Sequence, residues 1–97
     1  MEKNLIGRFA YSKAGHDKGT LYVIVRQECS YVFLCDGKYH TLEKCKKKAL
    51  KHIDLYNECV DDVLLQRILN KDKLFDYEIK YAIKKQKEGK EEGYVQK

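Results

Sequence analysis

Short apolar runs separated by tight turns fill the first 55 residues of the chain, and this pattern constrains the fold more than any other feature. Leu21 to Val25 and Tyr31 to Cys35 are typical of strands covered on both faces, and residues 27–30 predict a hairpin between them. Residues 5–12 predict an earlier strand, and an Asp-Gly turn signal predicts a returning strand over residues 38–42. Several short strands with tight turns in so few residues predict a small closed or nearly closed barrel.

The apolar positions change to a helical period after residue 60. The acidic pair at 61–62 predicts the start of a short helix that ends at Asn70. A longer helix to about Lys87 is expected to follow, with Asp72 or Asp76 as its cap. One face of this helix repeats four apolar residues at helical spacing: Phe75, Ile79, Ala82 and Ile83.

The predicted organisation therefore has three segments. Residues 1–59 form the barrel, residues 60–88 form a helical extension packed on it, and residues 89–97 form a tail whose dense mixed charge predicts disorder. Three residues beside the apolar stripe are interpreted as packing residues rather than as a binding surface: Leu74, Tyr77 and Tyr81. The predicted fold class is mainly β with α.

Positive charge is concentrated in the predicted barrel. The net charge is +5 and the pI is about 9.0, which favours a polyanionic partner, nucleic acid before an anionic membrane. Residues 1–60 hold 11 Lys and Arg against 7 Asp and Glu, whereas residues 61–97 hold 9 against 8. A solvated lysine loop and an anion-binding surface are both compatible with the densest cluster, which comprises Lys44, Lys46, Lys47, Lys48 and Lys51.

A polar loop precedes the strand at Leu21. Gly15 and Gly19 allow this loop to adopt backbone conformations that a Cβ would block, and Gly37 does the same in the Asp-Gly turn. The loop is expected to be both a turn and a contact surface, because it also carries three basic or titratable side chains: Lys13, His16 and Lys18.

The four cysteines contain no Cys-x-x-Cys pair and are expected to be reduced thiols. Cys35, His40 and Cys45 fall at four-residue gaps, with His52 further on, which resembles part of a zinc knuckle. The additional upstream cysteine of such a site is replaced by Val32, so the ligand set is incomplete. Small buried or half-buried strand residues are the favoured interpretation, and no metal site is predicted.

Catalysis, secretion and membrane insertion find no support in the sequence. Ser12 and His16 are the nearest approach to a catalytic pair, and no acid partner or oxyanion hole is identifiable beside them. Residues 1–15 include no apolar segment of signal-peptide length, and no run approaches 18 apolar residues. We therefore expect a cytoplasmic protein that is not an enzyme, uses no cofactor and contacts no membrane.

The segments GRFAYSKAGHDKGTLYVIV and YVFLCDGKYHTL resemble the KOW motif, in which a strand, a glycine-centred loop and a second strand belong to a small SH3-like barrel. Together with KCKKKALKHIDLY, they are similar to large-subunit ribosomal proteins of the fourteen-e type and to their short bacterial relatives, the KOW-domain RNA-binding proteins. The resemblance covers roughly residues 5–56. Those relatives have proline where this chain has Cys45.

The resemblance implies non-catalytic RNA binding through a basic face of the barrel, with ribosomal RNA or a ribosome-associated RNA as the ligand and ribosomal proteins as further partners. The free protein is expected to be a monomer. Tyr11 and Tyr39 are candidates for stacking on a base or sugar, or for barrel packing. The residues expected to contact RNA are Lys13, His16, Lys18, Lys38, His40, Lys44, Lys46, Lys47, Lys48, Lys51 and His52.

A protein-interaction module of the translation or transcription machinery is the alternative, because SH3-like barrels commonly bind proteins and a fold does not determine a function. The nearly neutral helical half, with its tyrosines, would be the natural surface for such a partner. Lysines clustered on the barrel favour RNA, whereas an apolar patch on the helices would favour protein.

Overall fold

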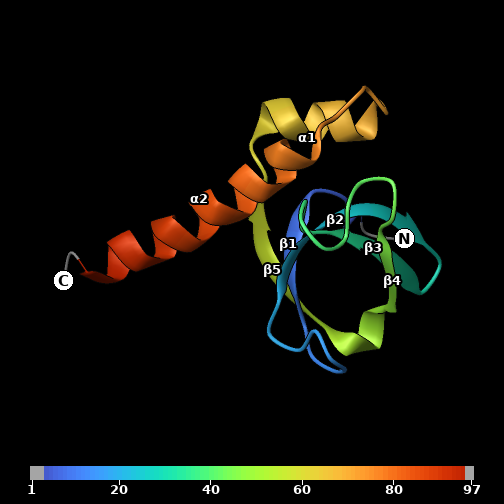
Figure 1. Cartoon of the computed structure of the whole chain (residues 1–97), viewed down its shortest axis with the longest axis horizontal. Helices are drawn as coiled ribbons and strands as arrows, with labels where there is room; N and C mark the ends of the chain where they lie inside the picture. Colours follow the sequence, from blue (N-terminus) through green and yellow to red (C-terminus); the bar gives the residue numbers. More distant parts are fainter. Residues whose placement is uncertain (1–3, 96–97) are drawn as a thin grey trace.

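The computed structural model describes residues 4–95, and the side chains of residues 4–88. Five strands form one antiparallel sheet in the order β4-β3-β2-β1-β5, and two helices follow it (Figure 1). The predicted class, mainly β with α, is confirmed at this level. The strands are β1 Arg8–Ser12, β2 Leu21–Glu28, β3 Tyr31–Cys35, β4 Lys46–Ala49 and β5 Ile53–Cys59; the short 3-10 turn η1 is Leu50–His52, and the helices are α1 Asp62–Leu69 and α2 Asp76–Val95.

The hairpin predicted within residues 21–35 is confirmed. β2 and β3 pair antiparallel, and the turn between them places Cys29 at a φ of 49°. The strand predicted over residues 38–42 is wrong. The Asp36 carboxylate accepts the backbone N–H groups of Lys38 (2.9 Å) and His40 (2.8 Å), and these bonds hold the segment in a compact turn instead of a ladder.

The lysine run forms the outermost strand of the sheet order, β4, rather than a loop. β4 pairs with β3, so that Lys47 lies opposite Phe33 and Lys48 lies opposite Val32. Successive side chains of a strand point to opposite faces. Lys46 and Lys48 therefore share one face of β4, and Lys47 lies on the other.

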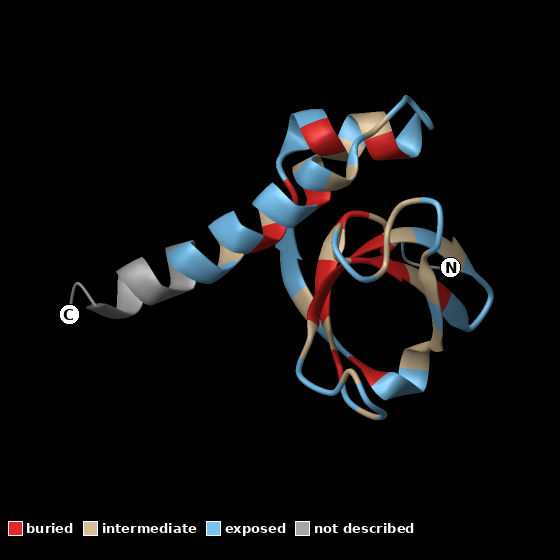
Figure 2. Ribbon diagram, viewed as in Figure 1, coloured by how far each residue is buried: buried red, intermediate tan, exposed pale blue. Residues whose placement is uncertain are grey.

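The sheet buries apolar side chains on both of its faces. Figure 1 shows the sheet strongly curved, with both helices on its outer side. Figure 2 shows buried residues along the strands and at the helix contacts. One buried layer comprises Leu5, Ala10, Tyr22, Ile24, Val32, Leu34 and Ile53. The other packs the sheet against the helices and includes Phe9, Leu21, Val23, Cys35, Leu64, Ile68, Ile79 and Ile83.

α1 begins and ends where the sequence predicts. The Asp61 carboxylate accepts the backbone N–H of Leu64 at 2.8 Å, and Asn70 follows the last helical residue. An ion pair between Arg67 of α1 and Glu78 of α2 joins the two helices. The helical half is therefore held together by polar contacts as well as by its apolar layer.

α2 differs from the prediction at both ends. α2 begins at Asp76, so the residue before its first position is Phe75, and neither Asp72 nor Asp76 is the cap. Glu78 accepts the backbone N–H of Phe75. Phe75 itself is exposed and lies outside the apolar stripe. The backbone helix continues to Val95, past the predicted end at about Lys87. The disorder predicted for residues 89–97 stays a prediction, because residues 96–97 and the side chains of 89–95 lie outside the described part.

The start of α2 is seated on the turn at residues 36–42. The Asp76 carboxylate accepts the backbone N–H of Leu42 at 2.7 Å. Gly37 has a φ of 76°, and a Cβ at this position would lie 2.4 Å from the carbonyl oxygen of Asp76 and 2.9 Å from the nitrogen of Lys80. Only glycine permits this close approach between turn and helix.

Candidate nucleic-acid interface

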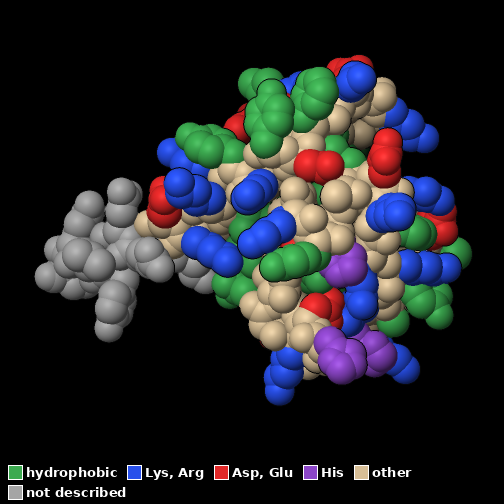
Figure 3. Space-filling view, viewed as in Figure 1, with side chains coloured by type: hydrophobic (Ala, Val, Ile, Leu, Met, Phe, Trp, Pro, Cys, Tyr) green, Lys and Arg blue, Asp and Glu red, His purple; other side chains and the backbone are tan. Residues whose placement is uncertain are grey.

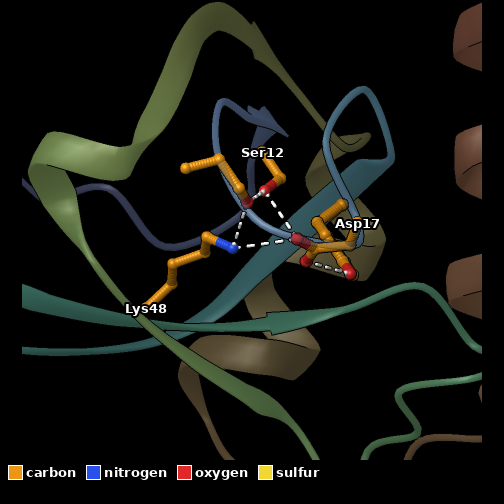
Figure 4. A network of polar contacts seen from close by, with 5 residues as sticks. Ser12, Asp17 and Lys48 are labelled. Atoms are coloured by element: carbon orange, nitrogen blue, oxygen red, sulfur yellow. Dashed lines mark hydrogen bonds and ion pairs between the residues drawn. The ribbon is translucent and has the colours of Figure 1, made fainter.

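A polar network holds the β1–β2 loop against the sheet (Figure 4). The Asp17 carboxylate accepts hydrogen bonds from the Ser12 hydroxyl (2.9 Å), the Tyr22 hydroxyl (2.8 Å) and the Lys48 ammonium (2.9 Å). Lys48 Nζ also donates to the carbonyl oxygen of Ala14 at 2.9 Å. The network ties the loop to β1, β2 and β4 at once.

The ion pair at the centre of this network is nearly enclosed. The side chains of Lys48 and Asp17 are 10% and 12% exposed. Burial raises the pKa of Asp17, but the hydrogen bonds from Lys48, Tyr22 and Ser12 outweigh burial, so this pKa lies well below its usual range. Burial and the adjacent Asp17 carboxylate raise the pKa of Tyr22. Asp17 is thus charged, and Tyr22 is a neutral donor, over the whole physiological range.

The predicted contact of Lys48 with RNA stays a prediction, and this network does not favour it. The Lys48 ammonium points inward, and its charge is balanced by Asp17. The reason is the alternation of β4, which places Lys48 on the face that the β1–β2 loop covers.

The loop presents its remaining basic side chains to solvent. Gly15 and Gly19 both have a φ of 89°, in the left-handed region that favours glycine, and they let the loop turn sharply above Asp17. Its exposed side chains are Lys13, His16 and Lys18. The backbone N–H of Lys13 donates to the carbonyl oxygen of His52 at 2.8 Å, so η1 and its exposed Lys51 and His52 lie beside the loop.

A groove of about 350 Å³ lies on another side of the loop. Gly19 and Leu21 border it from the loop and β2, and Tyr39 borders it from the 36–40 turn. Three lysines line the same groove: Lys38 of the turn and Lys80 and Lys87 of α2. Figure 3 shows Lys and Arg side chains gathered on this face of the molecule, with histidines among them.

Lys80 and Lys87 are absent from the residues predicted from sequence. Lys80, Lys84 and Lys87 are spaced by four and three residues, and this spacing places them along one side of a helix. This regular spacing is the one feature of the sequence that could have identified them as candidate contact residues. Nothing in the sequence indicated that this side of α2 borders the β1–β2 loop.

The predicted contact residues do not form one patch. Lys44 and Lys47 are exposed on the other side of the sheet, with Arg26 and Phe33. Lys46 is half-buried on the same face of β4 as Lys48. The residues that the structure gathers around the loop are Lys13, His16, Lys18, Lys38, His40, Lys51 and His52, and we call them, with Lys80 and Lys87, the loop surface.

The two tyrosines considered for stacking have different environments. Tyr11 is half-buried, and its ring makes an edge contact with Tyr56 at a centroid separation of 5.1 Å, which favours the packing alternative. Tyr39 is exposed beside the groove, with Lys38 Nζ 5.0 Å from its ring centroid. Tyr39 is therefore the one of the two that a ligand can reach.

The cysteines and histidines do not assemble within residues 4–88, the part of the chain whose side chains are described. Among these residues, no three His, Cys, Asp or Glu side chains lie close enough together to hold a metal ion. Burial raises the pKa of the Cys35 thiol to about 12, so this cysteine is protonated and a poor nucleophile. Across the same residues, no helix combines the length and apolar character needed to cross a bilayer.

No protein-family model matches the chain, and no curated protein sequence is detectably similar to it. The KOW-type assignment therefore stays a proposal, supported by the sequence motif and by a curved sheet of five antiparallel strands.

Proposed function

We propose that this chain is an SH3-like KOW barrel that binds RNA without catalysing a reaction, with ribosomal RNA or a ribosome-associated RNA as its ligand. The strong curvature of a five-stranded antiparallel sheet around one apolar layer supports a small barrel (Figure 1). The charge and the loop geometry support RNA as the ligand.

The observation that carries this proposal is the closed network beneath the β1–β2 loop. Asp17 and Lys48 fix the loop from inside, so the conformation of the exposed Lys13, His16 and Lys18 backbone is set before any ligand arrives. Binding to an already ordered loop costs less conformational entropy than binding to a flexible one. Asp17 is neutralised internally and does not repel a phosphate at the surface.

The chemistry of the loop surface favours phosphate over base edges. Lysine is a compact point charge, and phosphate contacts position a protein on nucleic acid without reading its sequence. The Lys38, Lys80 and Lys87 side chains line the groove beside the loop, where a folded RNA backbone can lie between them. We therefore expect recognition by shape and backbone, with a structured ribosomal fragment competing better than an unstructured oligonucleotide of equal length.

A salt titration of RNA affinity tests this proposal. Replacing Lys13 and Lys18 with glutamine should reduce the slope of log affinity against log salt by roughly 1.5, because each lost phosphate contact removes about 0.7 to 0.9. The matched control is Lys73→Gln with Lys85→Gln, which removes the same charge from exposed sites on the helical half. Equal losses in both double variants would show that the loop surface is not the interface.

The helical half supports a second function, protein binding. Val63, Tyr77 and Tyr81 are 72%, 68% and 60% exposed, and they line a groove of about 530 Å³ between α1 and α2. The interpretation of Tyr77 and Tyr81 as packing residues is therefore wrong. These rings project from α2 on the side away from its buried Ile79 and Ile83.

We call Val63, Tyr77 and Tyr81 the helical patch, and its role is tested separately from RNA binding. Tyr77→Ser combined with Tyr81→Ser should leave RNA affinity unchanged. In a cross-linking experiment in cells, the same double variant should no longer capture a protein that the unmodified chain captures. Loss of RNA affinity in this folded double variant would assign the patch to the RNA site instead.

A further inference from the structure

One stretch of the outer sheet face carries two aromatic rings and two cations. Tyr31 and Phe33 are two residues apart on β3 and therefore point to the same face. Lys47 on β4 lies opposite Phe33, with its Nζ 4.7 Å from the Tyr31 ring centroid and 5.9 Å from that of Phe33. Arg26 on β2 places its Cζ 4.5 Å from the Phe33 centroid. We call Arg26, Tyr31, Phe33 and Lys47 the aromatic face.

The helices cover this side of β3 at one end only. Cys35 is fully buried in the layer that packs against α1 and α2, Phe33 is half-buried, and Tyr31 is 43% exposed. The cations above the rings are exposed, and a cation–π contact at an exposed site contributes only about 0.5 to 1 kcal/mol. The rings are thus available to any flat ligand that can displace the cations sideways.

A groove of about 390 Å³ adjoins the aromatic face. Phe33, Val25 and Leu42 supply apolar lining, and Arg26, Lys44 and Lys71 supply positive charge, against Glu43 and Asp72. Lysine is depleted at the centres of protein–protein interfaces. The position of Lys47 directly above the rings therefore favours an anionic occupant with flat rings over a protein partner.

The aromatic face and the loop surface lie on different sides of the sheet, and η1 connects them. Tyr31 lies opposite Ala49, the last residue of β4, and the N–H of Leu50 in η1 donates to the carbonyl oxygen of Ser30 at 2.9 Å. η1 carries Lys51 and His52 of the loop surface. One RNA molecule can therefore reach from the loop surface around η1 to the two rings.

We propose that the aromatic face binds unpaired nucleotides of the RNA, with bases stacked on Phe33 and Tyr31 and their phosphates contacting Arg26 and Lys47; this inference rests on the proposed RNA-binding function. Every base has a π-face, so stacking tolerates any sequence and leaves the shape-based selection at the loop surface intact. The ligand is then a folded RNA element with a short single-stranded segment beside it. Arg26, which is paired with Glu28 in the free protein, exchanges that carboxylate for a phosphate.

The test uses three stem-loop RNAs with the same stem and loop: a blunt one, one with a four-nucleotide unpaired extension at the 5′ end, and one with the same extension at the 3′ end. The extension should raise affinity about fivefold or more at one end, the lower limit for stacking one base on an aromatic ring. Phe33→Leu and Tyr31→Leu should each reduce this gain while leaving the affinity for the blunt stem-loop within about twofold. Tyr81→Leu, a change of the same kind on an exposed ring of α2, should keep the gain.

The possible outcomes separate the two proposals. Blunt RNA that binds with no gain from either extension overturns the stacking site and leaves the proposed function standing. A gain that survives in both folded β3 variants also overturns the stacking site, because the bases then bind elsewhere. Absence of all RNA binding overturns the proposed function and this inference with it. Tyr31→Leu is informative even where Phe33→Leu destabilises the fold, since the Tyr31 ring is the more exposed of the two.

Discussion

Lys47 and Lys48 are neighbours in the sequence, but the two faces of β4 give them opposite environments. Lys48 points inward, where Asp17 and the carbonyl oxygen of Ala14 accept its hydrogen bonds. Lys47 points outward over the rings of Tyr31 and Phe33. A run of lysines on a strand is therefore not a uniform positive surface. On β4, the charge of Lys48 faces the inside and is balanced there by Asp17, while the charge of Lys47 faces outward.

Lys48 and Lys47 are also expected to contribute differently to the free energy of unfolding. Breaking a buried ion pair by removing one partner typically costs 3 to 5 kcal/mol, because an uncompensated charge stays in a poorly hydrated site. An exposed cation contributes little to stability and keeps its charge for a ligand. Lys48 thus contributes to folding, whereas its neighbour Lys47 keeps its charge for binding. The alternation of side chains along the strand assigns these roles.

The largest expected effect is the loss of Asp17. Asp17→Ala should lower the free energy of unfolding by about 3 kcal/mol or more, since it leaves the Lys48 ammonium enclosed without its carboxylate. Urea denaturation measures this change. Lys47→Met, on the other face of β4, should change the same free energy by no more than about 1 kcal/mol, because it removes only an exposed cation–π contact.

A double variant sharpens this result. Combining Asp17→Asn with Lys48→Met removes both charges together and should recover part of the lost stability, because no unpaired charge remains. Equal destabilisation by Asp17→Ala and Lys47→Met would contradict the distinction between the two faces.

The next effect is a loss of stability in acid. The pKa of Asp17 is lowered in the folded protein, so its contribution is fully present above the unfolded carboxyl pKa of about 3.9 and is lost as the pH falls toward the folded value. Between pH 4 and pH 2, the unfolding free energy of the unmodified protein should fall more steeply than that of Asp17→Asn, by up to about 1.4 kcal/mol per pH unit.

Comparing the pH dependence of the unfolding free energy in the unmodified protein and in Asp17→Asn separates the contribution of Asp17 from that of the other carboxylates. Hydrogen bonds from Arg26 and Arg67 lower the pKa of Glu28 and of Glu78, and these groups titrate in the two proteins alike. If the unfolding free energies of the two proteins fell equally steeply between pH 4 and pH 2, the Asp17–Lys48 pair would contribute nothing to stability.

The smallest expected effect concerns RNA binding by the outer face. Lys47→Gln should reduce the salt slope of affinity for an RNA with an unpaired extension by about 0.8, the value for a single phosphate contact. Asp17→Asn combined with Lys48→Met should leave that slope unchanged, because this double variant removes the internal pair as a whole and leaves no charge uncompensated. A slope reduced by the double variant and unaffected by Lys47→Gln would reverse the proposed roles of the two faces.

Local signals in the sequence were sufficient for some elements. The β2–β3 hairpin and the ends of α1 are found from short apolar runs and from the Asp61 cap. The strand expected at residues 38–42 is absent because the Asp36 side chain takes the N–H groups that a ladder would need. β4 was missed because lysine has a low preference for strands, and pairing with β3 overrides that preference.

The candidate site was predictable only for residues that lie close together in the sequence. The two glycines and the basic residues of the β1–β2 loop are adjacent in the sequence, and they identify this loop as a candidate contact. The inward direction of Lys48 depends on the register of β4, which no local pattern specifies. Lys80 and Lys87 join the groove only through the docking of α2, and the exposure of Tyr31 depends on where the helices stop covering the sheet.

Gly37 determines the width of the basic groove without touching any ligand. The carbonyl oxygen of Asp76 lies only 2.4 Å from where a Cβ of residue 37 would be, so the turn and the helix are in backbone contact. Lys38 follows Gly37 in the turn, and Lys80 and Lys87 belong to α2. The backbone contact between turn and helix therefore sets the distance from Lys38 to these two lysines. A side chain of any size at position 37 would displace the start of α2 and move two ammonium groups relative to the third. A homologue could therefore change which RNA contours fit the groove through one uncharged substitution, with every lysine retained.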